Sequence, residues 1–107
     1  QLGKVERMAG YIANHYTEPV TVAEIAEHVD LHPNYAMTLF KQVCGMSLMD
    51  YVLRHRISHC QRLLATTEDT ILDIALVAGF GSLSRFYDAF TKACGCTPRQ
   101  YRKRVQR

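Results

Sequence analysis

Two histidines and four cysteines are the residues of this chain best suited to bind a metal ion. His55 and His59 lie four residues apart, so on a helix they would share a face, which is the spacing of a metal-binding pair. The adjacent Cys60 would point about 100° away from them, and no further ligand follows at a fixed spacing. The paired C-x-x-C spacing of a structural zinc site is missing from the four cysteines, Cys44, Cys60, Cys94 and Cys96. We therefore expect reduced thiols, no metal and no other cofactor.

Sequence patterns of enzymes are also missing. The chain has no G-x-S-x-G, no glycine-rich loop for phosphate and no carboxylate pair in an apolar setting. Its 107 residues, 48% of them hydrophobic, suffice for one ordinary domain or two very small ones. It contains no uncharged apolar run of about 18 residues and no signal peptide. We expect a folded, non-enzymatic protein that is cytoplasmic and does not bind membranes.

Charge is distributed unevenly along the chain. Residues 1–50 carry three basic and six acidic side chains, whereas residues 51–107 carry ten basic and four acidic ones. The basic excess ends in the segment RQYRKRVQR. A basic half attracts polyanions such as nucleic acids, although a solvated terminal helix would have the same composition.

The apolar residues follow a helical period over almost the whole chain. Thr21 followed by Glu24 predicts a capping box, and Gly45 predicts a helix end. The predicted apolar faces include Val5 to Tyr16, then Val22, Ile25, Ala26 and Val29, then Tyr35, Ala36, Leu39, Phe40 and Val43.

The longest predicted helix runs from about Ser47 to Thr66 and would be about 30 Å long. Its apolar residues divide into a front group and a rear group, as expected of a helix that contributes to two small cores. These groups are Leu48, Tyr51, Val52 and Leu53, and Ile57, Cys60, Leu63 and Leu64.

The second half of the chain repeats the first. TVAEIAEHV from Thr21 matches TILDIALVA from Thr70 in residue type, at an offset of 49 residues. FKQVCGMSLMDY from Phe40 matches FTKACGCTPRQY from Phe90 at an offset of 50, because the second turn, AGFGS, has one extra residue. This agreement in register indicates an internal duplication.

Each copy predicts two short helices joined by a tight turn. This is the arrangement of a helix-turn-helix, whose second helix lies in the major groove of DNA. The long helix between the copies is close in length to the ~34 Å that separates successive major grooves on one face of DNA. With the basic second half, these features favour binding of double-stranded DNA. The alternative is a helical protein-interaction module without sequence-specific DNA binding, and the salt dependence of DNA affinity would distinguish the two.

The block ILDIALVAGFGSLSRFYDAFTKACGCTPRQYR resembles the signature of the AraC/XylS family of bacterial transcription regulators. The shared features are an Ile-Ala pair, Gly-Phe at the turn, Ser-x-Phe with a second Phe four residues on, Gly-x-Thr-Pro and Tyr-Arg. The first half agrees more loosely, through VAEIAEHV, YAMTLFK and CGMSLMDYV, so the resemblance covers about residues 5–104. Within the family, the segment ERMAGYIANHYTEPVTVAEIAEHV is similar to a regulator of sugar utilisation.

The resemblance implies an all-α domain of about seven helices. Two helix-turn-helix lobes, each a homeodomain-like three-helix unit, would cover about residues 5–46 and 67–107, with a long shared helix at about 47–66 between them. In this family such a domain usually follows an N-terminal domain that senses a small molecule. Because residue 1 is Gln and not Met, we expect a fragment that lacks this sensing domain. The resemblance further implies a sugar as the sensed molecule, RNA polymerase as a partner and oligomer formation, if any, through the missing domain.

The resemblance also assigns residues to DNA. In the second lobe Gly79 and Phe80 would form the turn, and Phe86 and Phe90 would be buried, which leaves the other faces of that helix for DNA; His32 and Pro33 would form the first turn. The implied base-facing residues are Asn34, Met37, Thr38, Leu83, Ser84, Arg85, Tyr87 and Asp88, with Arg85 near a phosphate or a base edge.

Some of these assignments are unusual. An acid such as Asp88 is unfavourable near phosphates unless it accepts a hydrogen bond from a cytosine amino group or pairs with Arg85. Met37 and Leu83 cannot hydrogen-bond to bases and would contact thymine methyl groups or fill space.

Basic residues near the helix ends are predicted to contact phosphate. These are Lys41, Lys92, Arg99, Arg102 and Lys103. For Lys103, as for Arg104 and Arg107, we favour exposure to solvent over contact. The helix starts at Thr21 and Thr70 would add backbone amides directed at phosphates.

Overall fold

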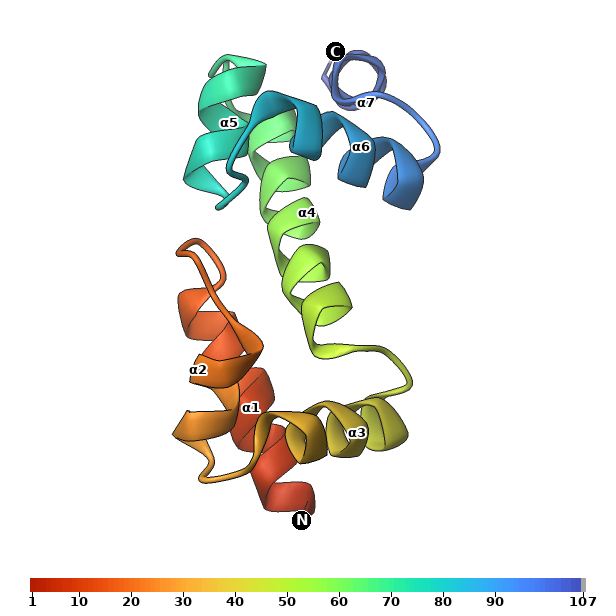
Figure 1. Cartoon of the computed structure of the whole chain (residues 1–107). Coiled ribbons are helices and arrows are strands. Elements are labelled where there is room, and N and C mark those ends of the chain that lie inside the picture. The colour runs from red at the N-terminus through yellow and green to blue at the C-terminus, as the bar shows by residue number, and fades with distance from the viewer. Residues whose placement is uncertain (107) are drawn as a thin grey trace. The chain divides into compact units, whose positions relative to one another are not determined.

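Seven helices make up the computed structural model, which describes residues 1–106. No strand occurs within that range. The helices confirm the all-α class and the expected helix count, and Figure 1 shows their order along the chain. They are α1 (Leu2–His15), α2 (Val22–His28), α3 (Pro33–Cys44), α4 (Leu48–Thr66), α5 (Ile71–Val77), α6 (Leu83–Cys94) and α7 (Pro98–Val105).

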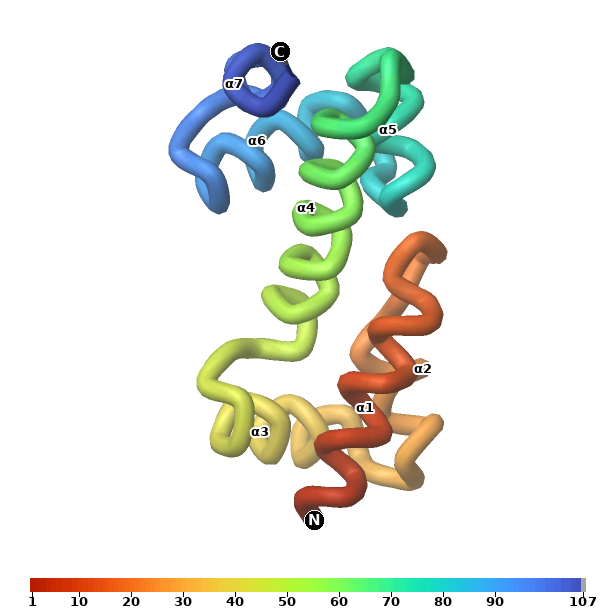
Figure 2. The backbone as a smooth tube through the Cα atoms, turned by 180° about the vertical axis from the view of Figure 1, so that it is seen from behind, coloured from red at the N-terminus to blue at the C-terminus, as the bar shows by residue number. Residues whose placement is uncertain are grey.

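The chain divides into two compact units. Unit 1 runs from Gln1 to Arg54, and unit 2 begins at His55. The boundary lies inside α4, which continues without a break from Leu48 to Thr66, as Figure 2 shows. One helix therefore supplies core residues to both units, as its two apolar groups predicted: Leu48 and Val52 are buried in unit 1, and Ile57, Cys60 and Leu64 are buried in unit 2.

The core of unit 1 combines the apolar faces of α1, α2, α3 and the start of α4. Phe40 of α3 is fully buried and meets the ring of Tyr51 edge-on, with centroids 5.3 Å apart. Two side chains of α1 donate to carbonyls at the end of α2: Lys4 Nζ to Val29 O (2.8 Å) and Arg7 Nη2 to His28 O (3.0 Å). The other buried residues are Val5, Met8, Ile12, Val20, Ile25, Ala26, Val29, Ala36, Leu39, Leu48 and Val52.

The buried residues of unit 2 repeat this plan with more aromatic rings. Phe86 lies against Phe80 and Phe90, with ring centroids 5.2 Å and 5.5 Å away. Phe90 meets Tyr101 edge-on at 5.5 Å, as Phe40 meets Tyr51 in unit 1. The burial of Phe80, Phe86 and Phe90 confirms the predicted core face of α6 and the predicted turn residue.

The two helix-turn-helix turns are nearly the same in their backbone. Leu31 N–H donates to Ala26 O in the first turn, and Phe80 N–H donates to Ala75 O in the second, both at 3.0 Å. The residue before each donor has a positive φ, 56° at Asp30 and 105° at Gly79. Glycine reaches the second angle without a steric penalty, which suits Gly79 to the turn position that the resemblance implied for it.

Two details of the sequence-based prediction are corrected. Tyr35 and Val43, assigned to the apolar face of the third helix, are 47% and 48% exposed. Thr21 accepts from Glu24 N–H (3.2 Å), but its hydroxyl donates to the Glu24 carboxylate (3.0 Å), which is not the reciprocal pattern of a capping box. A reciprocal capping box instead joins Thr97 and Gln100 at the start of α7.

Candidate nucleic-acid interface

The outward face of α6 is polar and accessible. On a helix, residues two positions apart lie about 200° apart around the axis, so Asp88 lies opposite the buried ring of Phe86. Ser84 and Thr91 lie near Asp88 on the same face, and all three are exposed. One face of α6 therefore packs in the core of unit 2, and the opposite face is accessible to a ligand.

The flanks of this face carry the remaining predicted residues of α6. Arg85 and Lys92 are exposed on one flank, while Leu83 is 39% exposed and Tyr87 is half-buried on the other. The helix begins at Leu83 because the Ser82 hydroxyl accepts from Arg85 N–H at 3.2 Å. The cap uses the backbone amide of Arg85, and the guanidinium takes no part in it.

The outward face of α3 is built in the same way. Asn34, Thr38 and Lys41 are exposed, and Met37 is 40% exposed beside them. Here His32 is the cap, since its Nδ1 accepts from Asn34 N–H at 3.2 Å. The Thr38 hydroxyl donates to Asn34 O of its own helix at 3.0 Å, so this face presents fewer free polar groups than its sequence suggests.

Four of the five residues predicted to contact phosphate have charged groups that are free to do so. Within residues 1–106, their charged groups form no hydrogen bond and no ion pair, and all are exposed: Lys41, Lys92, Arg99 and Lys103. Arg104 is exposed as well, and Arg107 lies outside the described residues. Exposed cations without partners are the groups that positioning contacts to DNA require.

Arg102 is bound within unit 2 instead. Its Nε donates to Leu64 O (3.2 Å), Nη1 to Asp69 O (2.7 Å) and Nη2 to Thr67 O (3.1 Å). These carbonyls lie at and after the end of α4, where backbone acceptors lack helical partners. The structure therefore gives Arg102 a stabilising role at the junction of α4, α5 and α7, and we leave it out of the proposed contacts.

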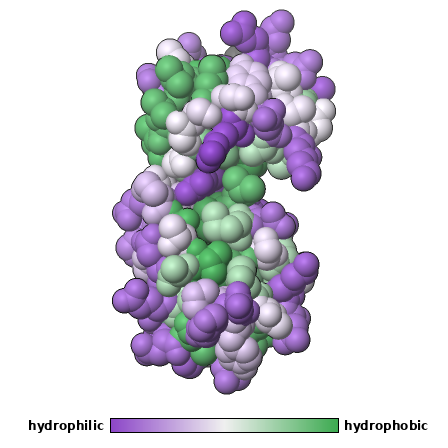
Figure 3. Space-filling model, in the orientation of Figure 1, coloured by the Kyte–Doolittle hydropathy of each residue, from purple (hydrophilic) through white to green (hydrophobic). Residues whose placement is uncertain are grey.

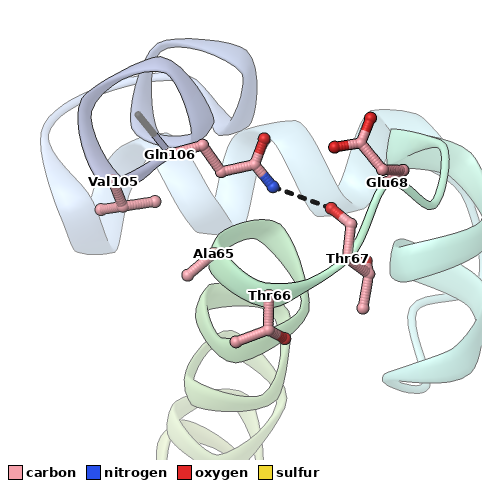
Figure 4. Close-up of a pocket in the computed structure, with 6 residues that line it drawn as sticks. All are labelled: Ala65, Thr66, Thr67, Glu68, Val105 and Gln106. Atoms are coloured by element: carbon pink, nitrogen blue, oxygen red, sulfur yellow. Dashed lines mark hydrogen bonds between the residues drawn. The ribbon is translucent and has the colours of Figure 1, made fainter.

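A shallow pocket lies at the same junction. Figure 4 shows Gln106 reaching across it to the carbonyl of Thr67, at 2.8 Å, and Gln106 Nε2 also donates to Leu64 O at 2.9 Å. Its lining residues are Ala65, Thr66, Thr67, Glu68, Val105 and Gln106. Glu68 is the one titratable side chain among these described residues.

The starts of α2 and α5 are less suited to phosphate than the sequence suggested. The Thr21 and Thr70 hydroxyls accept from the amides of Glu24 and Asp73 (3.2 and 3.1 Å), which uses part of the free N–H groups. Both helices also carry an acid in the first turn, and a carboxylate there opposes an approaching phosphate. We leave these helix starts out of the proposed contacts.

The histidines and thiols considered for metal binding have pKa values that reflect burial. Burial and then the charge of Arg62 lower the pKa values of His55 and His59. Burial and then Cys94 raise the pKa of the buried Cys60 thiol to about 12, which disfavours the thiolate that would bind a metal. Among residues 1–106, no group of three or more His, Cys, Asp or Glu side chains is arranged to hold a metal ion.

One candidate contact was missed in the sequence. Thr91 lies on the outward face of α6 and is exposed. The internal repeat could have indicated it, because an offset of 50 places Thr91 at the position of Lys41 in unit 1. Gln42 is likewise the counterpart of Lys92.

Comparison with known sequences places both helix-turn-helix units in one domain family. The helix-turn-helix domain family matches residues 25–104. The melibiose operon regulatory protein of Escherichia coli K12 is 47% identical over 102 residues, which cover 95% of this chain and 34% of that protein. The chain thus spans about a third of this curated relative. In the described part of the chain, no helix has the length and apolar character of a membrane span.

Solved structures share the whole fold. The C-terminal domain of AraT, a response regulator from Geobacillus stearothermophilus, has a TM-score of 0.93 and 31% identity, covering 97% of this chain and 87% of that one. An AraC-type regulator from Chromobacterium violaceum has a TM-score of 0.89 and 27% identity, covering 97% and 93%. The DNA-binding domain of AdpA, solved with a target DNA, has a TM-score of 0.88 and 21% identity, covering 94% and 90%, and supports the fold alone.

The paired helix-turn-helix units, the match over residues 25–104 and the similarity to AraC-type regulators lead to one conclusion. Most of the chain, from the middle of α2 to the end of α7, lies within the matched region. This chain belongs to the family of AraC-type helix-turn-helix DNA-binding domains.

Proposed function

We propose that this chain is the DNA-binding part of a bacterial transcription regulator and that α3 and α6 each read the major groove of double-stranded DNA. The outward face of α6 carries this proposal, because Ser84, Arg85 and Asp88 are exposed there while Phe86 and Phe90 hold the helix in the core. The base-facing residues are Asn34, Met37, Thr38, Leu83, Ser84, Arg85, Tyr87 and Asp88, to which the structure adds Thr91 as a candidate.

Phosphate contacts from Lys41, Lys92, Arg99 and Lys103 would hold each helix in register on the duplex. Such contacts contribute affinity without reading sequence. They also make affinity fall steeply with salt, because each neutralised phosphate releases condensed counterions.

The remainder of the regulator is proposed from its relatives. The melibiose operon regulatory protein is about three times as long as the matched region, so we propose a further domain that senses a small molecule, with a sugar as the first candidate. Oligomer formation is assigned to that domain. Because its proposed target is DNA, we place the protein in the bacterial cytoplasm and assign it no catalytic activity.

A protein partner is favoured by the outer face of α5. Leu72, Leu76 and Val77 are 47%, 50% and 56% exposed, and Figure 3 shows hydrophobic residues gathered over the position of α5 in Figure 1. An offset of 49 pairs them with Ala23, Glu27 and His28 on α2, so this apolar face is not a requirement of the fold. We propose RNA polymerase as the partner that it contacts.

The test of DNA binding compares an exposed with a buried residue of α6. Arg85→Ala should leave the melting temperature nearly unchanged and cost ~1 to 3 kcal/mol of binding, with relaxed preference at one or two base pairs if the contact is to a base. Sequences selected by the purified protein from random duplexes supply the site for this measurement. If Phe90→Ala and Arg85→Ala lose the same thermal stability, Arg85 is structural and this surface is not the DNA-facing one.

A second measurement separates DNA binding from protein interaction. Arg99→Ala should weaken all DNA sequences about equally and lower the salt slope by ~1, since one phosphate contact is lost. Arg99→Lys keeps the positive charge at this exposed position and should leave the slope nearly unchanged. Affinity of the wild type that does not change with salt would favour the protein-interaction module.

A further inference from the structure

Asp88 is an unpaired acid at the centre of the proposed reading surface. It is exposed and lies on the side of α6 opposite the buried ring of Phe86. Within residues 1–106 its carboxylate forms no ion pair and no hydrogen bond, and Arg85, one turn earlier on the same helix, is not its partner. One of the two ways to accommodate this acid near DNA, pairing with Arg85, is therefore not used.

An unpaired carboxylate in a major groove is repelled by the phosphates on both sides. Only a hydrogen-bond donor on a base edge can offset that cost, and in the major groove the donors are the amino groups of cytosine and adenine. The adenine amino group lies between two acceptors, its own N7 and the O4 of the paired thymine, which repel a carboxylate. The cytosine amino group has an acceptor on one side only, because its own ring presents a C–H there.

We propose that Asp88 selects cytosine by accepting a hydrogen bond from its N4 amino group. This inference rests on the proposed function of α6 and adds the identity of one base. It assigns to Asp88 discrimination rather than affinity, since the carboxylate lowers affinity for every sequence that lacks the amino group at that position.

The repeat supplies an internal contrast. The counterpart of Asp88 in unit 1 is Thr38, which is neutral and whose hydroxyl donates to Asn34 O within α3 at 3.0 Å. The backbone plan of the helix-turn-helix therefore does not require an acid at this position. Selection of cytosine by a carboxylate at this helix position is accordingly assigned to unit 2 alone.

The test compares three proteins on the same DNA: the wild type, Asp88→Ala and Asp88→Asn. Random duplexes are first selected with each protein, and affinity is then measured on the selected site and on the same site with a single C·G pair changed to T·A. For the wild type we expect one position that requires cytosine, where the change costs roughly 5- to 150-fold in affinity.

Asp88→Ala should lose the preference at that position and keep it at the others. Its affinity for unrelated duplexes should rise, because a repulsive charge is removed. Asp88→Asn should move the preference toward adenine, whose N6 and N7 match an amide. Thr38→Ala is the matched control and should leave the cytosine preference unchanged. All variants should have nearly the same melting temperature as the wild type, since both side chains are exposed.

The inference is overturned if Asp88→Ala selects the same bases as the wild type, or if its affinity falls equally on all duplexes. A wild-type protein that selects no sequence would instead contradict the proposed function itself. Sequence-specific binding with no cytosine requirement overturns the role of Asp88 alone and leaves DNA binding by the domain intact.

Discussion

Val5, Met8 and Ile12 are buried on α1 at spacings of three and four residues, and Ile57, Cys60 and Leu64 are buried on α4 at the same spacings. On this pattern Cys60 is the smaller counterpart of Met8, whereas on the helix that follows the turn unit 2 has the larger residue. There unit 1 has Ala36 and unit 2 has Phe86, both fully buried. A large residue on one helix thus accompanies a small residue on another, and the order is exchanged between the units. Close packing tolerates such exchanges when the total volume is conserved, so two copies of one backbone plan can hold different side chains.

Emptying the larger of these buried sites should give the largest effect on stability. Phe86→Ala empties a fully buried ring site between Phe80 and Phe90 and should cost about 3–5 kcal/mol of unfolding free energy. Adding Cys60→Met to this variant should recover part of the loss, because it copies the arrangement of unit 1. Urea denaturation followed by circular dichroism measures both. If the double variant is no more stable than Phe86→Ala, the two positions do not exchange volume.

The second effect concerns a cation that unit 2 has and unit 1 lacks. Arg102, whose counterpart is Val52, donates to three carbonyls at the end of α4. Arg102→Ala leaves these acceptors without their charged donor and should cost about 2 kcal/mol, the range of hydrogen bonds to charged groups. Arg99→Ala, an exposed change on the same helix, should stay within about 0.5 kcal/mol. Equal losses in thermal unfolding would show that the guanidinium contacts do not stabilise unit 2.

Alanine substitutions in the two turns should differ by a smaller amount in the unfolding free energy that they cost. Gly79→Ala places a side chain at φ 105° and should cost about 1–2 kcal/mol. Asp30 already carries a side chain at φ 56°, a left-handed angle that Asp tolerates, so Asp30→Ala should cost less than Gly79→Ala. Amide hydrogen exchange of core residues reports each unit separately. A larger loss at Asp30 would mean that its side chain, and not its backbone angle, stabilises the first turn.

The smallest expected effect is a pH dependence confined to α4. Burial and then Arg62 lower the pKa values of His55 and His59 in the folded protein. The unfolded chain therefore binds more protons as the pH falls through the usual titration range of histidine, so their contribution is present above that range and lost below it. The melting temperature should fall modestly from about pH 7.5 to about pH 5. Changing both histidines to Gln should flatten this part of the profile, and an unchanged profile would contradict their role.

The sequence predicted the elements of this fold because each depends on local signals. Gly45 and Gly95 end α3 and α6 in the left-handed conformation, and Ser47 caps α4 by accepting from Asp50 N–H at 3.1 Å. The repeat also predicted both turns, including the extra residue in the second. The capping box of Thr97 and Gln100 has the ordinary spacing, and the sequence could have predicted it.

Other features depend on contacts between distant residues. Arg102 belongs to a basic segment, and only the position of the end of α4 shows that its guanidinium binds carbonyls 33 to 38 residues away in the chain. Tyr35 was assigned to an apolar face by residue type, whereas its place on α3 leaves it exposed. For the candidate site, the helical period correctly separated buried from outward residues of α6, but partners of individual side chains required the fold.

The two helices that we propose to read DNA both end on a cysteine, Cys44 in α3 and Cys94 in α6. Cys44 is exposed, whereas Cys94 is half-buried and accepts from Gln61 Nε2 at 3.5 Å. Burial and then Cys96 raise the pKa of Cys94, which slows its attack on an electrophile. A thiol-reactive fluorophore should therefore label α3 first and leave α6 until unit 2 opens. The wild-type chain thus carries a selective attachment point for following α3 by fluorescence without any engineered residue.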